Sequence, residues 1–265
     1  MKFISSSNNP EIKLVSNFLS NPGSTKFKNF FFLEGEKLVR EAINSGLKLK
    51  SLFFLEGKEN LFDNSAQINH SVIVPLKIMK KITSLASPPP VVGLFLNRPE
   101  VSFKKLLSNG STFIFLDRIQ DPGNLGTIIR SADGFGIDGI FTSTGCCSIS
   151  NPKLVRSAMG SIFHTPILEI EDFDEFKNTL DQHQIELVAS DMGGISLYEI
   201  QLPQKVMFVF GNEGMGISPD IDKHCKKKLG IPMPGLAESF NVSIAASIFL
   251  YERRRNFPKA IGKNC

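Results

Sequence analysis

The stretch Leu116-Asp117-Arg118-Ile119-Gln120-Asp121-Pro122-Gly123-Asn124-Leu125-Gly126-Thr127-Ile128-Ile129-Arg130 sets the pattern for the second half of the chain. An apolar strand ends, a Pro-Gly turn follows, and a helix begins with apolar residues along one face. This order is typical of a parallel α/β sheet, in which ligands bind outside the carboxyl ends of the strands. Asn124 lies at the helix start and Arg130 further along it, although a helix cap and a surface arginine would explain both.

The same alternation of strand and helix continues from Thr112 onward. The expected strands cover 113–117, 139–143, 185–190, 206–211 and 229–232, and the expected helices cover 124–134, 151–160, 172–182, 218–227 and 241–255. Val206-Met207-Phe208-Val209-Phe210 is apolar throughout, as expected for a parallel strand that is covered on both faces. We therefore predict an α/β domain over residues 112–265 with a mostly parallel sheet.

The first hundred residues predict a smaller α/β domain. Apolar runs that indicate strands lie at 30–33, 52–55, 72–74 and 91–96. Glu36 to Ser45 has the spacing of an amphipathic helix, and Gly46 is a suitable stop. We assign residues 1–100 to this domain and residues 101–111 to a linker that contains a short helical piece.

Charge is distributed unevenly along the 265 residues, whose net charge is +4. Residues 1–110 contain 15 Lys+Arg and 8 Asp+Glu, a net +7, whereas residues 111–265 contain 15 and 18, a net −3. A basic first domain is typical of a protein that contacts nucleic acid. A solvated lysine-rich surface would explain the charge alone equally well.

Several other classes of protein are disfavoured by the sequence. No apolar run approaches the roughly 20 residues of a transmembrane helix, and the N-terminus has no apolar core of a secretory signal. None of the four cysteines belongs to a Cys-x-x-Cys pair, so a zinc site is not expected. We predict a cytoplasmic protein that binds neither membrane nor metal.

Two further glycine-bearing segments follow predicted strands. Phe210-Gly211-Asn212-Glu213-Gly214-Met215-Gly216-Ile217-Ser218 has three glycines in six residues, which allows the backbone to approach a ligand closely. Glu213 is its only charged side chain. Leu229–Asn241 leads into a helix, with Ser239 and Asn241 around the helix start. A pair of caps would also explain these two residues.

Together, in this order and spacing, the three segments resemble the three signature motifs of the SpoU (TrmH-like) RNA 2′-O-ribose methyltransferases of the SPOUT superfamily. The matching residues are Asp121–Gly126 with Arg130, Gly211–Gly214 with Gly216, and Ile231–Met233 with Ser239–Ser243. Residues 151–160 resemble an intervening helix of the family, and Phe32-Leu33-Glu34-Gly35 with the helix after it resembles the RNA-binding extension of many members.

The resemblance implies an enzyme that transfers a methyl group from S-adenosylmethionine to a ribose 2′-hydroxyl and releases S-adenosylhomocysteine. It also implies a deep trefoil knot in the C-terminal domain and a homodimer. The long N-terminal domain favours ribosomal RNA as the substrate. Transfer RNA as the substrate, and a non-catalytic RNA-binding protein, are the alternatives.

The resemblance also implies which residues carry the reaction. The residues expected at the reacting ribose are Asn124, Arg130, Glu213, Ser239 and Asn241. Those expected to hold the cofactor are Gly211, Ile231, Met233, Leu236 and Phe240, of which Phe240 stands where many members have leucine. One proposal for the family makes the arginine a general base. Because a guanidinium is hard to deprotonate, we expect Arg130 to grip a phosphate instead.

Overall fold

The computed structural model describes residues 1–27, 29–62, 71–97 and 101–259. Contacts divide the chain into two compact units, one of Met1–Pro99 with Ser148–Phe163 and one of Glu100–Cys147 with His164–Cys265. The boundary predicted at residue 100 falls among 98–100, outside the described residues. Residues 148–163 join the first unit by their contacts, whereas the sequence division puts them in the second domain. That division, at 1–100, 101–111 and 112–265, stays a prediction.

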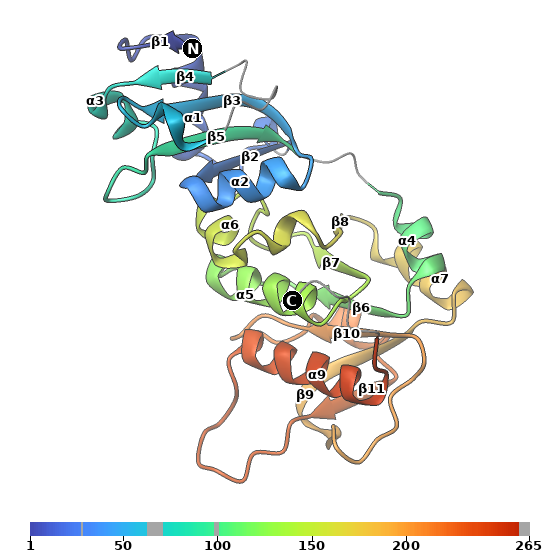
Figure 1. Ribbon diagram of the computed structural model, residues 1–265. Helices are drawn as coiled ribbons and strands as arrows, with labels where there is room; N and C mark the ends of the chain where they lie inside the picture. The colour runs from blue at the N-terminus through green and yellow to red at the C-terminus, as the bar shows by residue number, and fades with distance from the viewer. Residues whose placement is uncertain (28, 63–70, 98–100, 260–265) are drawn as a thin grey trace. The chain divides into compact units, whose positions relative to one another are not determined.

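The first unit contains a mixed five-stranded sheet in the order β1-β4-β3-β5-β2 (Figure 1). Strand β3 pairs parallel with β4 and antiparallel with β5. The four strands predicted for this region are confirmed. The strands are β1 Lys2–Phe3, β2 Phe30–Glu34, β3 Lys48–Leu55, β4 Ser71–Val74 and β5 Val91–Leu96, and the helices are α1 Pro10–Ser20, α2 Glu36–Asn44, α3 Leu76–Met79 and α6 Pro152–Ala158.

Helix α1 covers one face of this sheet and was missed in the sequence prediction. Its residues Ile12, Val15 and Phe18 are buried in the cluster that includes the phenylalanines of β2 and β3. Asn9 caps the helix by accepting a hydrogen bond from the backbone of Glu11. The signals were an asparagine followed by proline at the first helical position and an apolar spacing of three.

A buried carboxylate holds α6 to this unit. The side chain of Glu34, at the end of β2, accepts hydrogen bonds from Thr83 Oγ1 at 2.6 Å and from the Ser84 backbone at 2.7 Å. It also accepts one from Arg156 Nη1 on α6 at 2.7 Å, within an ion pair. A buried charge is tolerated when it is paired and hydrogen-bonded in this way.

The second unit contains a six-stranded sheet in the order β11-β9-β10-β6-β7-β8, and every pairing in it is parallel. The predicted α/β fold with a mostly parallel sheet is confirmed. The strands are β6 Thr112–Leu116, β7 Gly139–Ser143, β8 Ile167–Ile170, β9 Glu186–Ser196, β10 Val206–Phe210 and β11 Lys227–Gly230. The helices are α4 Phe103–Asn109, α5 Pro122–Gly134, α7 Phe173–Gln182, α8 Pro219–Asp222 and α9 Val242–Asn256.

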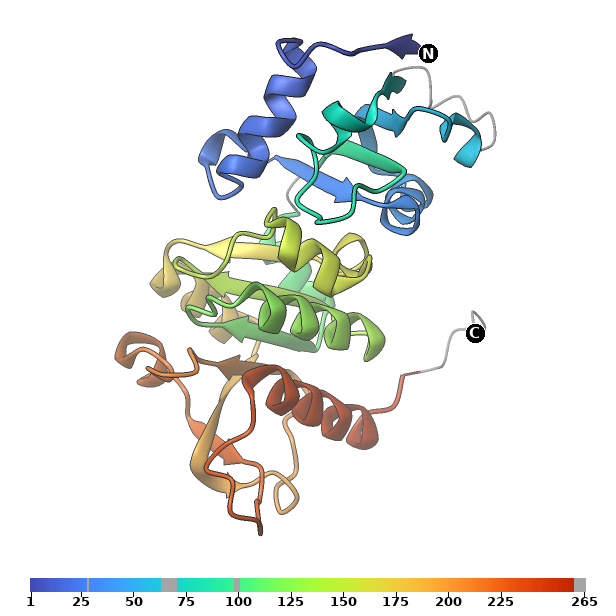
Figure 2. The ribbon, with the colours of Figure 1, turned by 90° about the vertical axis from the view of Figure 1, so that its left-hand side faces the viewer.

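Helices cover both faces of the parallel sheet. On one face Phe176 of α7 packs against Phe115 and Phe141, in a cluster that also contains α4. On the other face Phe249 of α9 packs edge-on against Phe208 and Phe210 of β10. Helices α5 and α9 contact each other and lie side by side in Figure 1 and Figure 2. This burial on both sides explains the uninterrupted apolar strands.

Two elements of the second unit differ from the sequence prediction. Strand β8 was missed because only Ile170 of its four residues is buried, so an edge strand leaves little apolar pattern. The helix predicted over 218–227 is wrong, since α8 ends at Asp222. Lysines favour a helix by propensity, but Lys227 and Lys228 begin β11 and form ion pairs with acidic neighbours.

Arg253 of α9 is a fully buried arginine. Its guanidinium donates to Thr112 Oγ1 at 3.0 Å and to the carbonyls of Pro203 at 2.6 Å and Gln204 at 2.5 Å. It also stacks over the ring of Phe257 at 3.7 Å. Burial lowers the pKa of Arg253 to about 10, and the side chain is still protonated at neutral pH. The arginine therefore joins the C-terminal helix to the strand starts at the opposite edge from the loops.

Replacing Arg253 with methionine is expected to lower the free energy of unfolding by about 3 kcal/mol, because the volume is kept while buried carbonyls lose charged donors. Urea titration followed by circular dichroism measures this change. Arg130→Met is the control, since Arg130 is exposed on α5 and engages no other described residue through hydrogen bonds or ion pairs, and its effect should stay within about 0.5 kcal/mol. Equal stabilities for the two variants would contradict the assigned role.

Candidate active site

Three loops of the second unit leave the same edge of the parallel sheet, after β6, β10 and β11. Strands β6 and β10 are neighbours, with β7 and β8 on one side and β9 and β11 on the other. The order of strands therefore reverses between β6 and β10, and such a switch point is where open α/β sheets bind ligands. The three segments selected from the sequence all lie at this edge.

The loop after β6 fixes the start of α5. Asp121 is the N-cap, and its Oδ1 accepts a hydrogen bond from the backbone of Asn124 at 2.8 Å. Pro122 occupies the first helical position, where the missing N–H costs no hydrogen bond. Leu125 and Ile128 are buried under the helix. The cap and the buried face together hold Asn124 in the first turn, above the strand ends.

Asn124 connects the three loops through its side chain. Its Nδ2 donates to Glu213 Oε1 at 2.5 Å, and its Oδ1 accepts from Asn241 Nδ2 at 3.0 Å. The structure therefore brings together three of the five residues predicted at the reacting ribose, one from each motif. An amide that bridges a carboxylate and a second amide has a fixed orientation, because its donor and its acceptor are both engaged.

Asn241 has a second contact that explains its place in the fold. It is the N-cap of α9, and its Oδ1 accepts hydrogen bonds from the Ser243 backbone at 2.9 Å and from Ser243 Oγ at 2.7 Å. One side chain thus both caps a helix and positions Asn124. Further along, Ser131 of α5 and Ser247 of α9 share a hydrogen bond of 2.7 Å, which keeps the two helices in register.

The other two predicted residues lie outside this cluster. Arg130 is exposed on α5, and Ser239 is exposed in the loop before α9. Within the part of the chain that the structure describes, no hydrogen bond or ion pair is present at either side chain. The guanidinium of Arg130 is therefore available to an external anion. Its planar geometry suits two parallel hydrogen bonds to a phosphate or a carboxylate.

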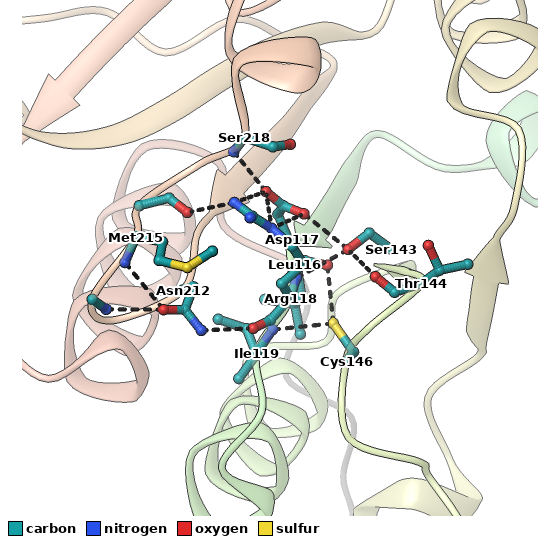
Figure 3. Close-up of polar contacts among 12 residues, drawn as sticks. Leu116, Asp117, Arg118, Ile119, Ser143, Thr144, Cys146, Asn212, Met215 and Ser218 are labelled. Atoms are coloured by element: carbon teal, nitrogen blue, oxygen red, sulfur yellow. Dashed lines mark hydrogen bonds and ion pairs between the residues drawn. The ribbon is translucent and has the colours of Figure 1, made fainter.

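A second polar network lies under the loops, around Asp117 at the end of β6 (Figure 3). The buried carboxylate of Asp117 accepts hydrogen bonds from the Ser218 backbone at 2.7 Å and from Ser143 Oγ at 2.9 Å. The guanidinium of Arg118 completes the set, with Nη2 at 3.2 Å from the carboxylate. Nearby, Cys146 Sγ accepts a hydrogen bond from the backbone of Ile119.

The hydrogen bonds keep Asp117 ionised. Burial acts to raise the pKa of this carboxyl, but the donors of Ser218, Ser143 and Arg118 outweigh it, so that the pKa lies below its ordinary value. The sequence prediction did not select Asp117 or Arg118. A signal existed, because an aspartate that ends a fully apolar strand must find several donors when it is buried.

The predicted cofactor residues lie on the loops after β10 and β11. Gly211, Ile231 and Met233 are half-buried, Phe240 is 41% exposed, and Leu236 is fully exposed. From 231 to 240 the chain is irregular, and no backbone hydrogen bond is present there among the described residues. Free N–H and C=O groups beside apolar side chains fit an adenosine group, which needs edge hydrogen bonds and an apolar contact to its base.

The described residues contain neither a candidate metal centre nor a helix that could cross a membrane. No group of three or more His, Cys, Asp or Glu side chains is arranged to hold a metal ion in the ranges covered. No helix within those ranges combines the length and apolar character needed to cross a membrane.

The parallel sheet and the polar loops at its switch point place this chain among α/β proteins that bind a ligand at the carboxyl ends of their strands. Residues 111–251, more than half of the chain, match the family model described as the SpoU rRNA Methylase family. The chain therefore belongs to the SpoU rRNA methylase family, and the predicted family and class of enzyme are confirmed. Residues 9–93 match the model of an MRM3-like substrate binding domain.

Two similar proteins cover nearly the whole chain, and a third covers little more than half of it. It is 29% identical to the 23S rRNA (guanosine(2553)-2′-O)-methyltransferase RlmP of Bacillus subtilis, over 96% of this chain and 100% of that protein. The AdoMet-bound rRNA methyltransferase of Sinorhizobium meliloti has a TM-score of 0.82 and 30% identity, covering 97% of this chain and 99% of that one. The TrmH/SpoU tRNA modifying enzyme of A. aeolicus has a TM-score of 0.50 and 25% identity, covering 58% of this chain and 79% of that one.

Proposed function

We propose that this protein transfers a methyl group from S-adenosylmethionine to a ribose 2′-hydroxyl of ribosomal RNA. The observation that carries the proposal is the Asn124–Glu213–Asn241 cluster at the switch point of the sheet, in a chain of the SpoU family. The AdoMet-bound relative supports the cofactor. The full-length similarity to RlmP supports ribosomal RNA, whereas the transfer RNA enzyme covers only 58% of this chain.

In this mechanism the protein aligns the hydroxyl and assists the loss of its proton. S-adenosylmethionine, when bound, supplies a methyl group on a positively charged sulfur. The guanidinium of Arg130 grips the phosphate beside the target ribose with two hydrogen bonds, which fixes the hydroxyl in line for attack. Because a guanidinium is a poor proton acceptor, the proton passes to that phosphate or to a water molecule.

The remaining predicted residues orient the partners of this step. Asn124 and Asn241, already joined by a hydrogen bond, face the ribose and Arg130, and Ser239 adds a hydroxyl at the same edge. Glu213 keeps the Asn124 amide in one orientation. The free backbone groups of 231–240 hold the adenine edge, with Gly211 close by, and Met233, Leu236 and Phe240 contact the base.

The first unit supplies affinity for RNA in this proposal. Exposed lysines on and after α3, among them Lys77, Lys80 and Lys81, bind phosphates and not particular bases. The match of residues 9–93 to a substrate-binding model supports this assignment. The target ribose is expected in an unpaired segment, where RNA is accessible to protein side chains.

The protein acts as a homodimer in this proposal. Ile244 and Tyr251 of α9 are exposed apolar side chains seven residues apart, which places them on one face of the helix. A second copy would cover this stripe. Sedimentation equilibrium at micromolar concentration should give the mass of two chains, and the mass of one chain would contradict the proposal. The trefoil knot and the cytoplasmic location also remain proposals here.

Mapping of ribose methylation tests the function directly. Ribosomal and transfer RNA are purified from cells with and without the gene, digested, and examined by mass spectrometry. We expect one 2′-O-methylated nucleotide to disappear from ribosomal RNA and to return with a wild-type copy of the gene. Loss of a methylated nucleotide from transfer RNA alone would contradict ribosomal RNA as the substrate. Unchanged methylation of both RNAs would favour a non-catalytic RNA-binding protein.

A further inference from the structure

Arg118 has a backbone conformation that its side chain disfavours. Its φ angle is +56°, in the left-handed region that is readily open only to glycine. Its N–H donates to Ser143 Oγ at 3.0 Å, and its carbonyl accepts from Asn212 Nδ2 at 3.0 Å. A disfavoured conformation that its surroundings hold in place, beside a site, calls for a functional explanation.

The guanidinium of Arg118 joins Asp117 to the loop after β10. Nη2 lies 3.2 Å from Asp117 Oδ2 and donates to the Gly216 carbonyl at 3.3 Å. Asp117 itself accepts from the Ser218 backbone in the same loop. As Figure 3 shows, the strand end and the loop are therefore tied at two points.

The loop of residues 211–218 is folded back on itself at the position where Arg118 holds it. Asn212 and Gly216 exchange two backbone hydrogen bonds, of 3.1 and 2.9 Å. A Cβ atom on Gly211 would lie 2.3 Å from the carbonyl carbon of Gly216, so only glycine permits this closure. Glu213 lies between these ends, and its carboxylate meets Asn124. The closed loop thus decides where Glu213 stands.

We propose that Asp117 and Arg118 are positioning residues for methyl transfer, because their ion pair clamps the 211–218 loop closed and so sets Glu213 against Asn124. The clamp acts through the loop and contacts neither RNA nor the methyl group. This inference rests on the function proposed above. It goes further by assigning a role to two residues outside the resemblance on which that function was built.

The test separates the guanidinium from the backbone conformation. Arg118→Gly and Arg118→Ala both remove the guanidinium, but only glycine adopts the left-handed conformation without strain. The melting temperature of Arg118→Gly should therefore lie a few degrees above that of Arg118→Ala. Single-turnover methyl transfer to ribosomal RNA from gene-deleted cells should fall by about 10-fold to 100-fold in both, since a small misplacement is costly. The half-saturating RNA concentration should not change.

Gln184 provides a matched control. It has a φ angle of +57° and is exposed after α7, away from the three loops. Gln184→Gly and Gln184→Ala should differ in melting temperature as the two Arg118 variants do, with transfer unchanged in both. Arg118→Lys is a second variant, because it keeps a cation beside Asp117 for folding but lacks the planar fork, and it should lose transfer about 10-fold.

The outcomes distinguish the clamp from the proposed function. Near-normal transfer by Arg118→Gly, or by Arg118→Lys, would overturn the clamp. Affinity for S-adenosylhomocysteine, measured by calorimetry without RNA, should weaken about fivefold in Arg118→Gly, because the cofactor loop loosens. If the wild-type protein transfers no methyl group, the proposed function fails. The affinity for S-adenosylhomocysteine then tests the clamp alone: weaker binding by Arg118→Gly than by the wild type supports it, and equal binding contradicts it.

Discussion

Arg130→Ala and Arg130→Lys are both expected to lose most methyl transfer while still folding and binding S-adenosylhomocysteine as the wild type does. Arg130 is exposed on α5 and engages no other described residue through hydrogen bonds or ion pairs, so its removal disturbs no internal contact. A lost charged hydrogen bond at the reacting centre costs roughly 1.5–3 kcal/mol, which is about one to two orders of magnitude in rate. Misplacement of the hydroxyl adds to this loss.

The lysine variant distinguishes two roles of the positive charge. An ammonium cannot reproduce the planar fork, so a bidentate grip on phosphate predicts losses in both variants. Single-turnover transfer of labelled methyl to RNA from gene-deleted cells measures them. Arg255→Ala, at an exposed arginine of α9, is the control and should stay within about twofold of wild type. Normal rates in Arg130→Ala would remove Arg130 from the site, and normal rates in Arg130→Lys alone would exclude the bidentate geometry.

The sheet of the second unit was predictable because its strands are buried on both faces. The run from Val206 to Phe210 and the one around Phe113 are apolar without interruption. This pattern indicates a strand that is buried on both faces, because a strand with one face in solvent alternates apolar and polar residues. Elements at the edge carry no such signal. Strand β8 and the lysine-rich start of β11 gain their structure from pairing with neighbours, and sequence propensity alone does not report this pairing.

The site was predictable only in part, for a related reason. Asn124, Glu213 and Asn241 lie in segments with recognisable turns and caps, so each could be selected before their contacts were known. Their mutual hydrogen bonds span 89 and 117 residues of sequence, and only the strand order brings them together. Asp117 carried a signal as the aspartate that ends an apolar strand, but Arg118 carried none, because the left-handed turn that gives it a role is a property of the fold.

Asn241→Asp is expected to keep the stability of the protein and to lose methyl transfer by about 10-fold to 100-fold. Aspartate caps a helix as well as asparagine does, so the hydrogen bonds from Ser243 should survive. The new carboxylate has no N–H to donate to Asn124 Oδ1, and its charge opposes Glu213 and the incoming phosphate. The orientation of the Asn124 amide is then lost, and a misplaced reacting group accounts for the size of the effect.

Two further variants separate capping from positioning. Asn241→Ala should lose transfer to a similar extent and also about 1 kcal/mol of stability, because the cap disappears with the donor. Asp172→Asn makes the reverse exchange at the cap of α7, where the side chain accepts a hydrogen bond from Glu175 and does not contact Asn124; both properties should be unchanged. Chemical denaturation and single-turnover transfer are measured on all three variants. If Asn241→Asp transferred methyl normally, capping alone would explain Asn241, and Asn124 would have to be oriented by Glu213 without it.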